Sequence, residues 1–224
     1  MDQTMILSLV YLFGVGSLLI FNELYYRKLG IEGEVSRKFA HVTATLATLP
    51  FPFIFPSHWY ILVLALLFTA VLYFTKISNH LDSIHDIERK SVGSYMLPVS
   101  IYLTFLISGI MDSYLLYILP ILILAICDPV AAILGLNIKR WNGKIVIFGN
   151  RLDKTWVGSG GFLATAIILS LIAIYIHRGY FDLNALWISL VVGLVSTLAE
   201  MLSWRGSDNL SIPLSALLVL ALMM

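Results

Sequence analysis

The sequence predicts an all-α bundle of membrane-spanning helices in one domain, residues 1–224, and three observations support this prediction. Hydrophobic residues make up 59% of the chain and charged residues only 12%, about half the charged share of a soluble domain. The apolar residues form runs close to the ~20 residues that a spanning helix needs. These runs do not alternate between apolar and polar positions, so helices rather than barrel strands would satisfy their backbone groups. The net charge of +1 creates no field that attracts nucleic acid, and we expect no such partner.

The positions of the apolar runs predict seven or eight spans. In chain order the segments are 5–26, 39–55, 59–75, 92–110, 113–138, 157–176, 183–202 and 210–224. Pro50 and Pro52 should shorten and bend the second segment, because proline removes a backbone donor and its ring clashes with the preceding turn. The eighth segment is short, so it either crosses the membrane or packs part-way into it.

The connections between these segments differ strongly in their content of basic residues. With eight spans, all but one of the 14 lysines and arginines fall in or beside odd-numbered connections, and the exception is Arg178. Cytoplasmic loops carry the excess of Lys and Arg in membrane proteins. We therefore expect a multi-pass protein of the cell membrane or an endomembrane, with its working face in the cytoplasm.

Two basic clusters precede expected helices on this face. Arg37 and His41 are four residues apart and share a helix face with Lys38 close by, and they either bind a ligand or extend toward lipid headgroups. Arg89 and Lys90 precede an expected helix start, where free backbone N–H groups attract anions. A solvated loop end remains the alternative for this second pair.

Asp128 interrupts a long apolar segment and is followed directly by Pro129. Acidic residues inside a membrane segment are costly and usually functional. A carboxylate near the membrane surface suits Mg²⁺, a hard cation with oxygen ligands that often also holds nucleotide phosphates. Glu200 and Asp208 add two carboxylates at the same expected depth, so the three acids predict a site for a metal–polyphosphate complex.

A lysine- and glycine-rich stretch separates these acids along the chain. Lys144 is followed by Lys154, Thr155, Gly158 and Ser159 at an expected helix start, a combination that would bind phosphate through backbone N–H groups and mobile cations. The stretch is not a Walker A loop, because Asp153 stands where that motif requires glycine. The glycines have a second interpretation, since small residues let membrane helices approach closely.

In this order, the clusters resemble the CTP-dependent polyprenol kinase family, which includes dolichol kinase and phytol kinase. The matching pieces, spread over roughly residues 35–215, are Arg37-Lys38-x-x-His41, Arg89-Lys90-Ser91-x-Gly93-Ser94, Asp128-Pro129, Gly135, Lys154-x-x-x-Gly158-Ser159, Glu200 and Asp208-Asn209-x-x-x-Pro213. The resemblance implies an enzyme embedded among membrane lipids that transfers the γ-phosphate of CTP to a lipid alcohol, with Mg²⁺ or another divalent cation. The acceptor would be an isoprenoid alcohol such as a polyprenol, phytol or geranylgeraniol, or diacylglycerol.

These implied activities assign a role to each candidate residue. Asp128 and Asp208 would hold Mg²⁺, and Glu200 or His41 would act as the base or orient the lipid hydroxyl. The expected phosphate contacts combine basic side chains, a hydroxyl and backbone donors: Arg37, Lys38, Arg89, Lys90, Lys144, Lys154, Thr155, Gly158 and Ser159.

Two other functions fit part of the pattern. A phosphatidate cytidylyltransferase would use the same nucleotide at the same face, and a small transporter would also need polar residues within helices. The polar residues here gather near one expected membrane surface, which argues against a pathway that crosses the membrane.

Overall fold

A computed structural model describes residues 3–29, 33–77, 92–138, 142–147 and 150–224. In chain order its helices and strands are α1 (Gln3–Leu29), α2 (Gly33–Ala47), α3 (Phe51–Ile54), α4 (His58–Ile77), α6 (Gly93–Ile110), α7 (Leu115–Leu122), the π-helical turn η1 (Ile123–Cys127), α8 (Asp128–Asn137), β1 (Lys144–Ile147), β2 (Asn150–Thr155), α9 (Trp156–Arg178), α10 (Leu183–Leu202) and α11 (Asp208–Met223).

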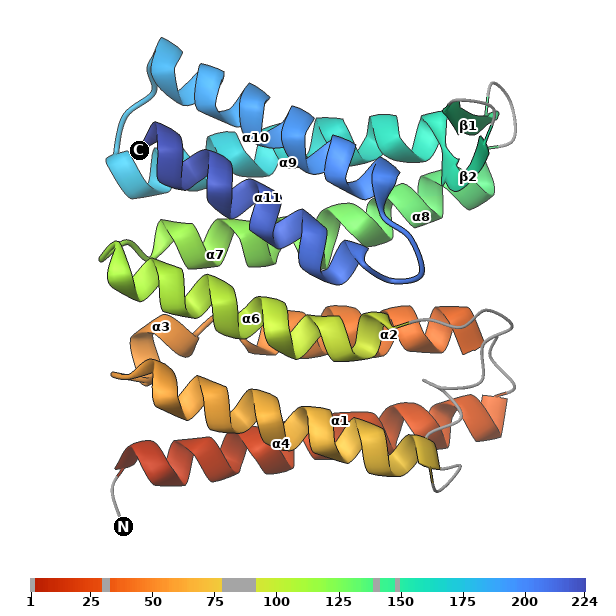
Figure 1. Cartoon of the computed structure of the whole chain (residues 1–224), viewed down its shortest axis with the longest axis vertical. Coiled ribbons are helices and arrows are strands. Elements are labelled where there is room, and N and C mark those ends of the chain that lie inside the picture. Colours follow the sequence, from red (N-terminus) through yellow and green to blue (C-terminus); the bar gives the residue numbers. More distant parts are fainter. Residues whose placement is uncertain (1–2, 30–32, 78–91, 139–141, 148–149) are drawn as a thin grey trace.

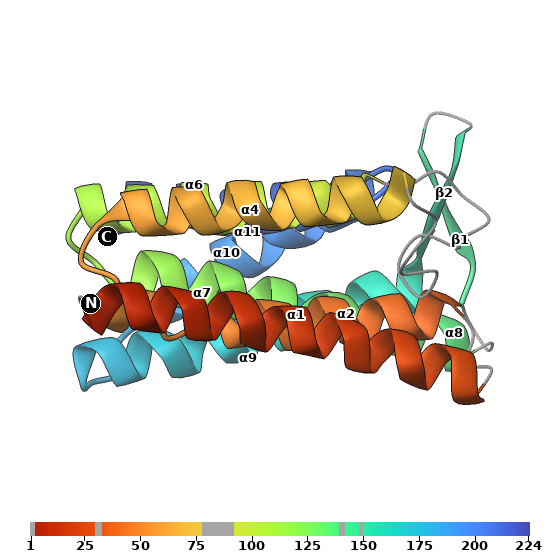
Figure 2. The ribbon, with the colours of Figure 1, turned by 90° about the horizontal axis from the view of Figure 1, so that it is seen from below.

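The long helices run side by side along one direction and form two layers (Figures 1 and 2). One layer contains α4, α6 and α11, and the other contains α1, α2, α9 and the continuous rod made by α7, η1 and α8. Helix α10 packs against both α9 and α11. The described residues therefore confirm a helical bundle.

Five described helical rods are long and apolar enough to cross a membrane: α4, α6, the α7–η1–α8 rod, α9 and α10. Helix α2 has 15 residues and α11 has 16, which is shorter than a full span. The structure thus supports a membrane protein, whereas the expected count of seven or eight spans is not confirmed by the helices that it describes.

Capping residues explain why several expected boundaries agree with the structure. The Oδ1 atom of Asp182 accepts a hydrogen bond from the backbone N–H of Ala185 at 2.6 Å, which starts α10 at Leu183 as expected. Gly179 ends α9 with a positive φ of 79°, a conformation that glycine adopts without a Cβ clash. The second expected segment is indeed broken at Pro50, and it divides into α2 and α3.

A short β-hairpin is the one part of the described fold that the all-α prediction missed. Strands β1 and β2 pair antiparallel, with Lys144 opposite Thr155 and Ile147 opposite Asn150. The hairpin lies beyond the ends of the helices (Figure 2). Its two strands are only 4 and 6 residues long, and the sequence analysis treated this stretch as a loop that precedes a helix.

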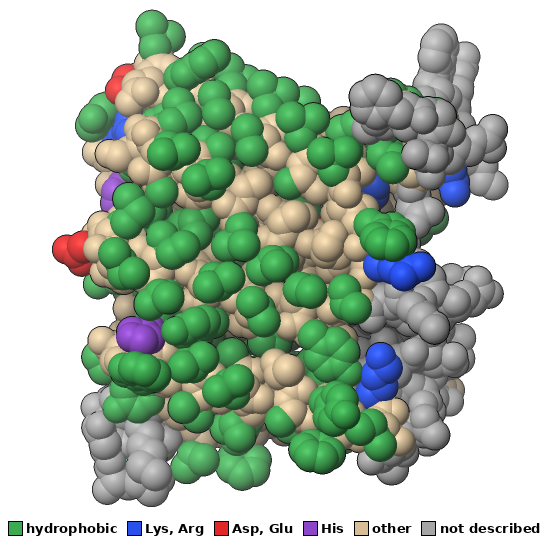
Figure 3. All heavy atoms as spheres, in the orientation of Figure 1, with side chains coloured by type: hydrophobic (Ala, Val, Ile, Leu, Met, Phe, Trp, Pro, Cys, Tyr) green, Lys and Arg blue, Asp and Glu red, His purple; other side chains and the backbone are tan. Residues whose placement is uncertain are grey.

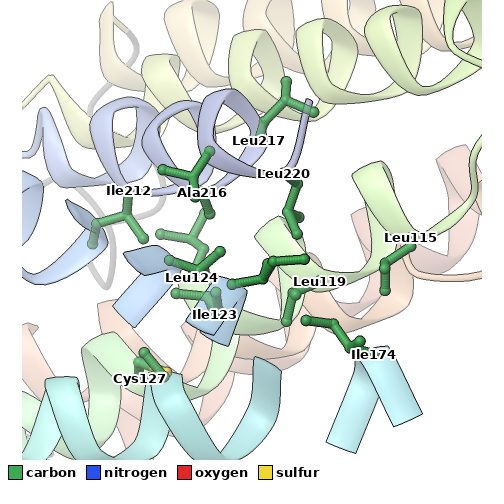
Figure 4. Close-up of a cluster of buried hydrophobic side chains, with 14 of the residues drawn as sticks. Leu115, Leu119, Ile123, Leu124, Cys127, Ile174, Ile212, Ala216, Leu217 and Leu220 are labelled. Carbon is green, nitrogen blue, oxygen red and sulfur yellow. The ribbon is translucent and has the colours of Figure 1, made fainter. Parts of the chain in front are cut away.

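The main hydrophobic core belongs to the second half of the chain. Side chains from the α7–η1–α8 rod, α9, α10 and α11 fill it, and Leu119, Ile123 and Leu124 meet Ile212 and Ala216 in its centre (Figure 4). These five residues are fully buried. This half supplies the helices that carry all three expected acidic residues.

Charged side chains are distributed unevenly over the outer surface. Apolar side chains cover the visible face of the bundle, and most of its lysines and arginines gather at one end (Figure 3). Lys76 near the end of α4 and Arg205 between α10 and α11 belong to connections expected at this end. Arg178 is the last residue of α9 and lies at the opposite end of the bundle. The orientation of these ends relative to a cell stays a prediction.

Candidate functional site

Lys154 stands at the centre of the three acids that the sequence singled out. Its Nζ atom lies 2.9 Å from Oε1 of Glu200, 3.4 Å from Oδ2 of Asp208 and 3.9 Å from Oδ1 of Asp128. The four residues come from β2, α10, α11 and α8. Residues separated by up to 80 positions in the sequence, from Asp128 to Asp208, thus converge on one ammonium group.

A second lysine joins this group from the other side of Asp128. The Nζ atom of Lys38, on α2, lies 4.0 Å from Oδ2 of Asp128. When all five side chains are ionised, three negative charges face two positive charges. We call these five residues, together with Ser159, the acidic cluster. Its helices come from both layers of the bundle, so it lies where the layers meet.

Burial within the acidic cluster is graded. The side chain of Glu200 is 2% exposed, that of Asp128 12%, and those of Lys154 and Asp208 19% and 20%. Glu200 therefore forms the floor, and Asp208 and Lys154 form the more open side. Buried ion pairs cost more in desolvation than they usually return in stability, so a cluster of five charges in an apolar bundle argues for a functional role.

The environment keeps Lys154 protonated at neutral pH. Burial by itself lowers the pKa of this ammonium, but the negative charges of Asp128, Asp208 and Glu200 outweigh it. The pKa of Lys154 is consequently raised above its ordinary value. The site holds a permanent, well-positioned cation that is suited to contact phosphate oxygens.

A π-helical turn directly precedes Asp128. Residues Ile123–Cys127 form η1, and four of them are buried in the core, including Cys127, which Figure 4 labels. A π-turn widens the helix by one residue and rotates the face that follows, and such turns often occur at functional sites. Asp128 is the first residue after this turn, and its Oδ1 atom lies 3.9 Å from Nζ of Lys154.

Ser159 holds the other oxygen of the most buried acid. Its hydroxyl donates a hydrogen bond of 2.9 Å to Oε2 of Glu200, while Oε1 accepts from Lys154. Both carboxylate oxygens of Glu200 are thereby fixed. The sequence predicts a phosphate contact for Ser159, whereas the hydrogen bond from its side chain to Glu200 was not predicted.

The start of α9 is tightly packed and internally hydrogen-bonded. The side chain of Thr155 caps the helix by accepting from the N–H of Gly158 at 3.2 Å. A Cβ atom on Gly158 would lie 2.8 Å from the carbonyl oxygen of Ala131, and one on Gly161 would collide with the Leu134 side chain. Both glycines therefore serve the close approach of α9 to α8, which is the packing interpretation left open above. A phosphate contact of Gly158 stays a prediction.

Two asparagines tie the surrounding elements together. Asn142 donates to the carbonyl of Gly135 at 2.6 Å and accepts from the N–H of Val157 at 3.3 Å, which joins the hairpin to α8 and α9. Asn209 donates to the carbonyl of Gly93 at 2.8 Å and so fastens the start of α11 to the start of α6. Neither asparagine was predicted from the sequence to have a role in the site, although Asn209 follows Asp208 at an expected helix start.

The remaining candidates lie outside the cluster or outside the described residues. His41 is three residues after Lys38 on α2, so it lies on the same side of that helix. Lys144 is exposed at the start of β1 and belongs to no ion pair among the residues that the structure describes. The backbone of Arg37 lies in α2 while its side chain is not described, and Arg89 and Lys90 lie outside the described residues.

The donor chemistry of the site fits Mg²⁺, but its geometry is arranged around an ammonium group. Asp128, Glu200 and Asp208 offer carboxylate oxygens, the ligands that this cation prefers. Among the described residues, no group of three or more His, Cys, Asp or Glu side chains is arranged to hold a metal ion. Binding of Mg²⁺ by Asp128 and Asp208 would therefore require Lys154 to move away from these two carboxylates.

No family model, curated protein or solved structure matches this chain.

Proposed function

We propose that this protein is a membrane-embedded lipid kinase that transfers the γ-phosphate of CTP to the hydroxyl of a lipid alcohol. The observation that carries the proposal is the convergence of Asp128, Glu200 and Asp208 on Lys154 at the charged end of an apolar bundle. Carboxylates and a charged lysine near a membrane surface would bind a water-soluble, phosphorylated donor beside an acceptor that is dissolved in lipid. The choice of CTP rests on the resemblance to the polyprenol kinase family.

The reaction needs little covalent chemistry from the protein, because phosphoryl transfer depends mainly on positioning and charge neutralisation. The oxygen of the lipid hydroxyl bonds to the γ-phosphorus, the bond from that phosphorus to the β-phosphate oxygen breaks, and CDP leaves. When bound by Asp128 and Asp208, Mg²⁺ would neutralise the phosphate oxygens of the nucleotide.

The chain's own residues supply the remaining steps. Lys154 would turn from the carboxylates toward the transferred phosphate, where its retained proton donates to the phosphate oxygens. Glu200, oriented by Ser159, would accept the hydroxyl proton, with His41 as the second candidate for this role. Arg37, Lys38 and Thr155 would add further phosphate contacts. Arg89, Lys90 and Lys144 would extend the contacts toward the donor's other phosphates.

The proposal includes a topology with seven or eight spans and the acidic cluster at the cytoplasmic surface. The bias of lysine and arginine toward one set of connections supports that orientation. CTP is made in the cytosol, so the donor would reach the cluster from the side where the basic residues gather.

The deciding experiment supplies CTP labelled at either its γ- or its α-phosphate to the purified protein, with Mg²⁺ and a panel of lipids. A kinase moves the γ-label into an organic-soluble lipid when a long-chain isoprenoid alcohol or diacylglycerol is present. Transfer of the α-label to phosphatidate alone would instead identify a cytidylyltransferase. Transfer of neither label, by protein verified as folded, would contradict both enzyme classes and favour a transporter.

A further inference from the structure

A shallow groove lies on the membrane-facing side of α4, beside the first turn of α6. Its lining is almost entirely apolar and aromatic, and consists of Leu66, Thr69, Ala70, Tyr73, Phe74 and Tyr95. Its volume of about 460 Å³ lies in the lower half of the range of small-molecule sites. The side chains of Leu66, Tyr73 and Phe74 are more than half exposed, so the groove opens sideways to the lipid.

Among the described residues, the positive charge of Lys76 stands at the end of this groove. The Nζ atom of Lys76 lies 5.6 Å from the ring centre of Tyr95, within the range of a cation–π contact. Lys76 is in the last turn of α4, so it belongs to the charged end of the bundle. The groove thus offers an apolar channel for a hydrocarbon chain and a cation for a phosphate at its charged end.

The beginning of α6 contacts both the groove and an element of the acidic cluster. Tyr95 packs against the buried pair Ala40 and Leu72 on one side of this helix. Two residues earlier, the carbonyl of Gly93 accepts from Asn209 on the other side, and Asn209 adjoins Asp208 of the cluster. A helix is about 10 Å across with its side chains, so a head group that passes over this first turn would reach Lys154.

We propose that the groove holds the hydrocarbon chain of the single-chain lipid alcohol that accepts the phosphate, and that Lys76 pairs with the head group once it is phosphorylated. The proposal rests on the proposed kinase function. One chain is expected rather than two because five of the six lining residues lie on a single helix, α4, so the lining is narrow. Lipid tails provide no hydrophobic driving force for entry, so selectivity arises from packing against the aromatic walls and from the charge of Lys76.

A photoreactive long-chain isoprenoid alcohol with a diazirine near the middle of its chain tests the location directly. In wild-type protein in lipid nanodiscs, we expect the label on peptides that contain residues 66–74 or Tyr95. Excess geranylgeraniol should reduce the labelling at least fivefold, and a two-chain phosphatidylglycerol should not. Equal competition by the phospholipid would identify an ordinary annular-lipid position and overturn the proposal, as would labelling confined to other helices.

A matched pair of variants tests the contribution of the walls. Ala70→Trp should fill the groove, reduce the labelling about tenfold and lower the ratio of kcat/KM for long-chain over short-chain alcohols about tenfold. Ala164→Trp adds the same side chain at an exposed position of α9 and should leave both measurements unchanged. If Ala70→Trp does not fold, Phe74→Ala removes a wall and should also lower the labelling. Unchanged labelling in the folded groove variant would overturn the proposal.

The proposed contact between Lys76 and the phosphorylated head group is tested separately, by competition. Lys76→Gln should weaken competition by a long-chain isoprenyl monophosphate about tenfold and leave competition by the uncharged alcohol unchanged. An equal effect on both competitors would contradict the role of Lys76. Labelling in the groove without any phosphoryl transfer would contradict the kinase function alone, whereas transfer with labelling elsewhere would contradict the groove alone.

Discussion

At the scale of single residues, Lys154 supplies the positive charge that compensates the three carboxylates of the acidic cluster. It is the cation that contacts all three carboxylates in the described structure, and only 19% of its side chain is exposed. Removal of one partner from a buried charge group leaves the remaining charges uncompensated, which typically costs ~3 kcal/mol or more.

The variant Lys154→Met should therefore lower both stability and activity. We expect a thermal unfolding temperature several degrees below that of the wild type and at least a ~10³-fold loss of phosphoryl transfer, the order found when a phosphate-stabilising charge is lost. Lys28→Met, which removes an exposed charge at the end of α1, is the matched control. Wild-type activity in Lys154→Met would remove the lysine from the mechanism.

Asp128→Asn separates chemistry from folding more cleanly, because an amide keeps the size of the side chain. If the carboxylate binds a metal–nucleotide complex, activity should fall ~10³-fold while the protein remains inserted and monodisperse. Gel filtration in detergent and the γ-label assay measure the two properties. Near-normal activity would place the reaction elsewhere, whereas failure to insert would favour a purely structural role.

The link between Ser159 and Glu200 predicts a smaller and more specific effect. Ser159→Ala removes the donor to Oε2 of Glu200 and leaves the ion pair with Lys154 in place. We expect kcat to fall about tenfold with little change in the KM for CTP, because the carboxylate loses its orientation rather than the nucleotide its contacts. A rise in the KM for CTP with unchanged kcat would favour a phosphate-binding role for the serine instead.

At the scale of elements, the close approach of α9 to α8 can be tested with two neighbouring glycines. Gly158→Ala would push a methyl group against the carbonyl of Ala131, which we expect to cost ~1–3 kcal/mol because neither helix can move far. Gly160 has open space at its Cβ position, so Gly160→Ala should be neutral. Thermal unfolding of the two variants measures the difference, and equal stability would contradict the packing role.

The same elements explain what the sequence could predict. Long apolar runs identified most helices, because burial and backbone satisfaction in lipid leave few alternatives. The convergence of Asp128, Glu200 and Asp208 was predictable from their similar expected depth. The hairpin and the η1 turn were not, since strands this short carry weak patterns and a π-turn is set by packing rather than by composition. Likewise, the partner of Ser159 depends on how α9 meets α10.

At the scale of the whole molecule, the uneven distribution of charge predicts the orientation in the membrane. In a Cys127→Ala background, Gly143→Cys should react with a membrane-impermeant maleimide only from the cytoplasmic side. Tyr180→Cys, at an exposed position near the other end, should react only from outside. Labelling of Gly143→Cys from outside would reverse the orientation and leave a cytosolic donor without access to the acidic cluster.

The contact of Asp208 with Lys154 has a consequence for the synthesis and membrane insertion of the protein. A ribosome makes α2 with Lys38 first, then Asp128, and α11 after both. Helix α11 carries both the acid that completes the cluster and the asparagine that fastens α6. Until α11 inserts, Lys154, Asp128 and Glu200 lack Asp208, the third acid of the cluster. Under the proposed function, the growing chain would therefore neither bind nucleotide nor modify lipid before α11 has joined the bundle.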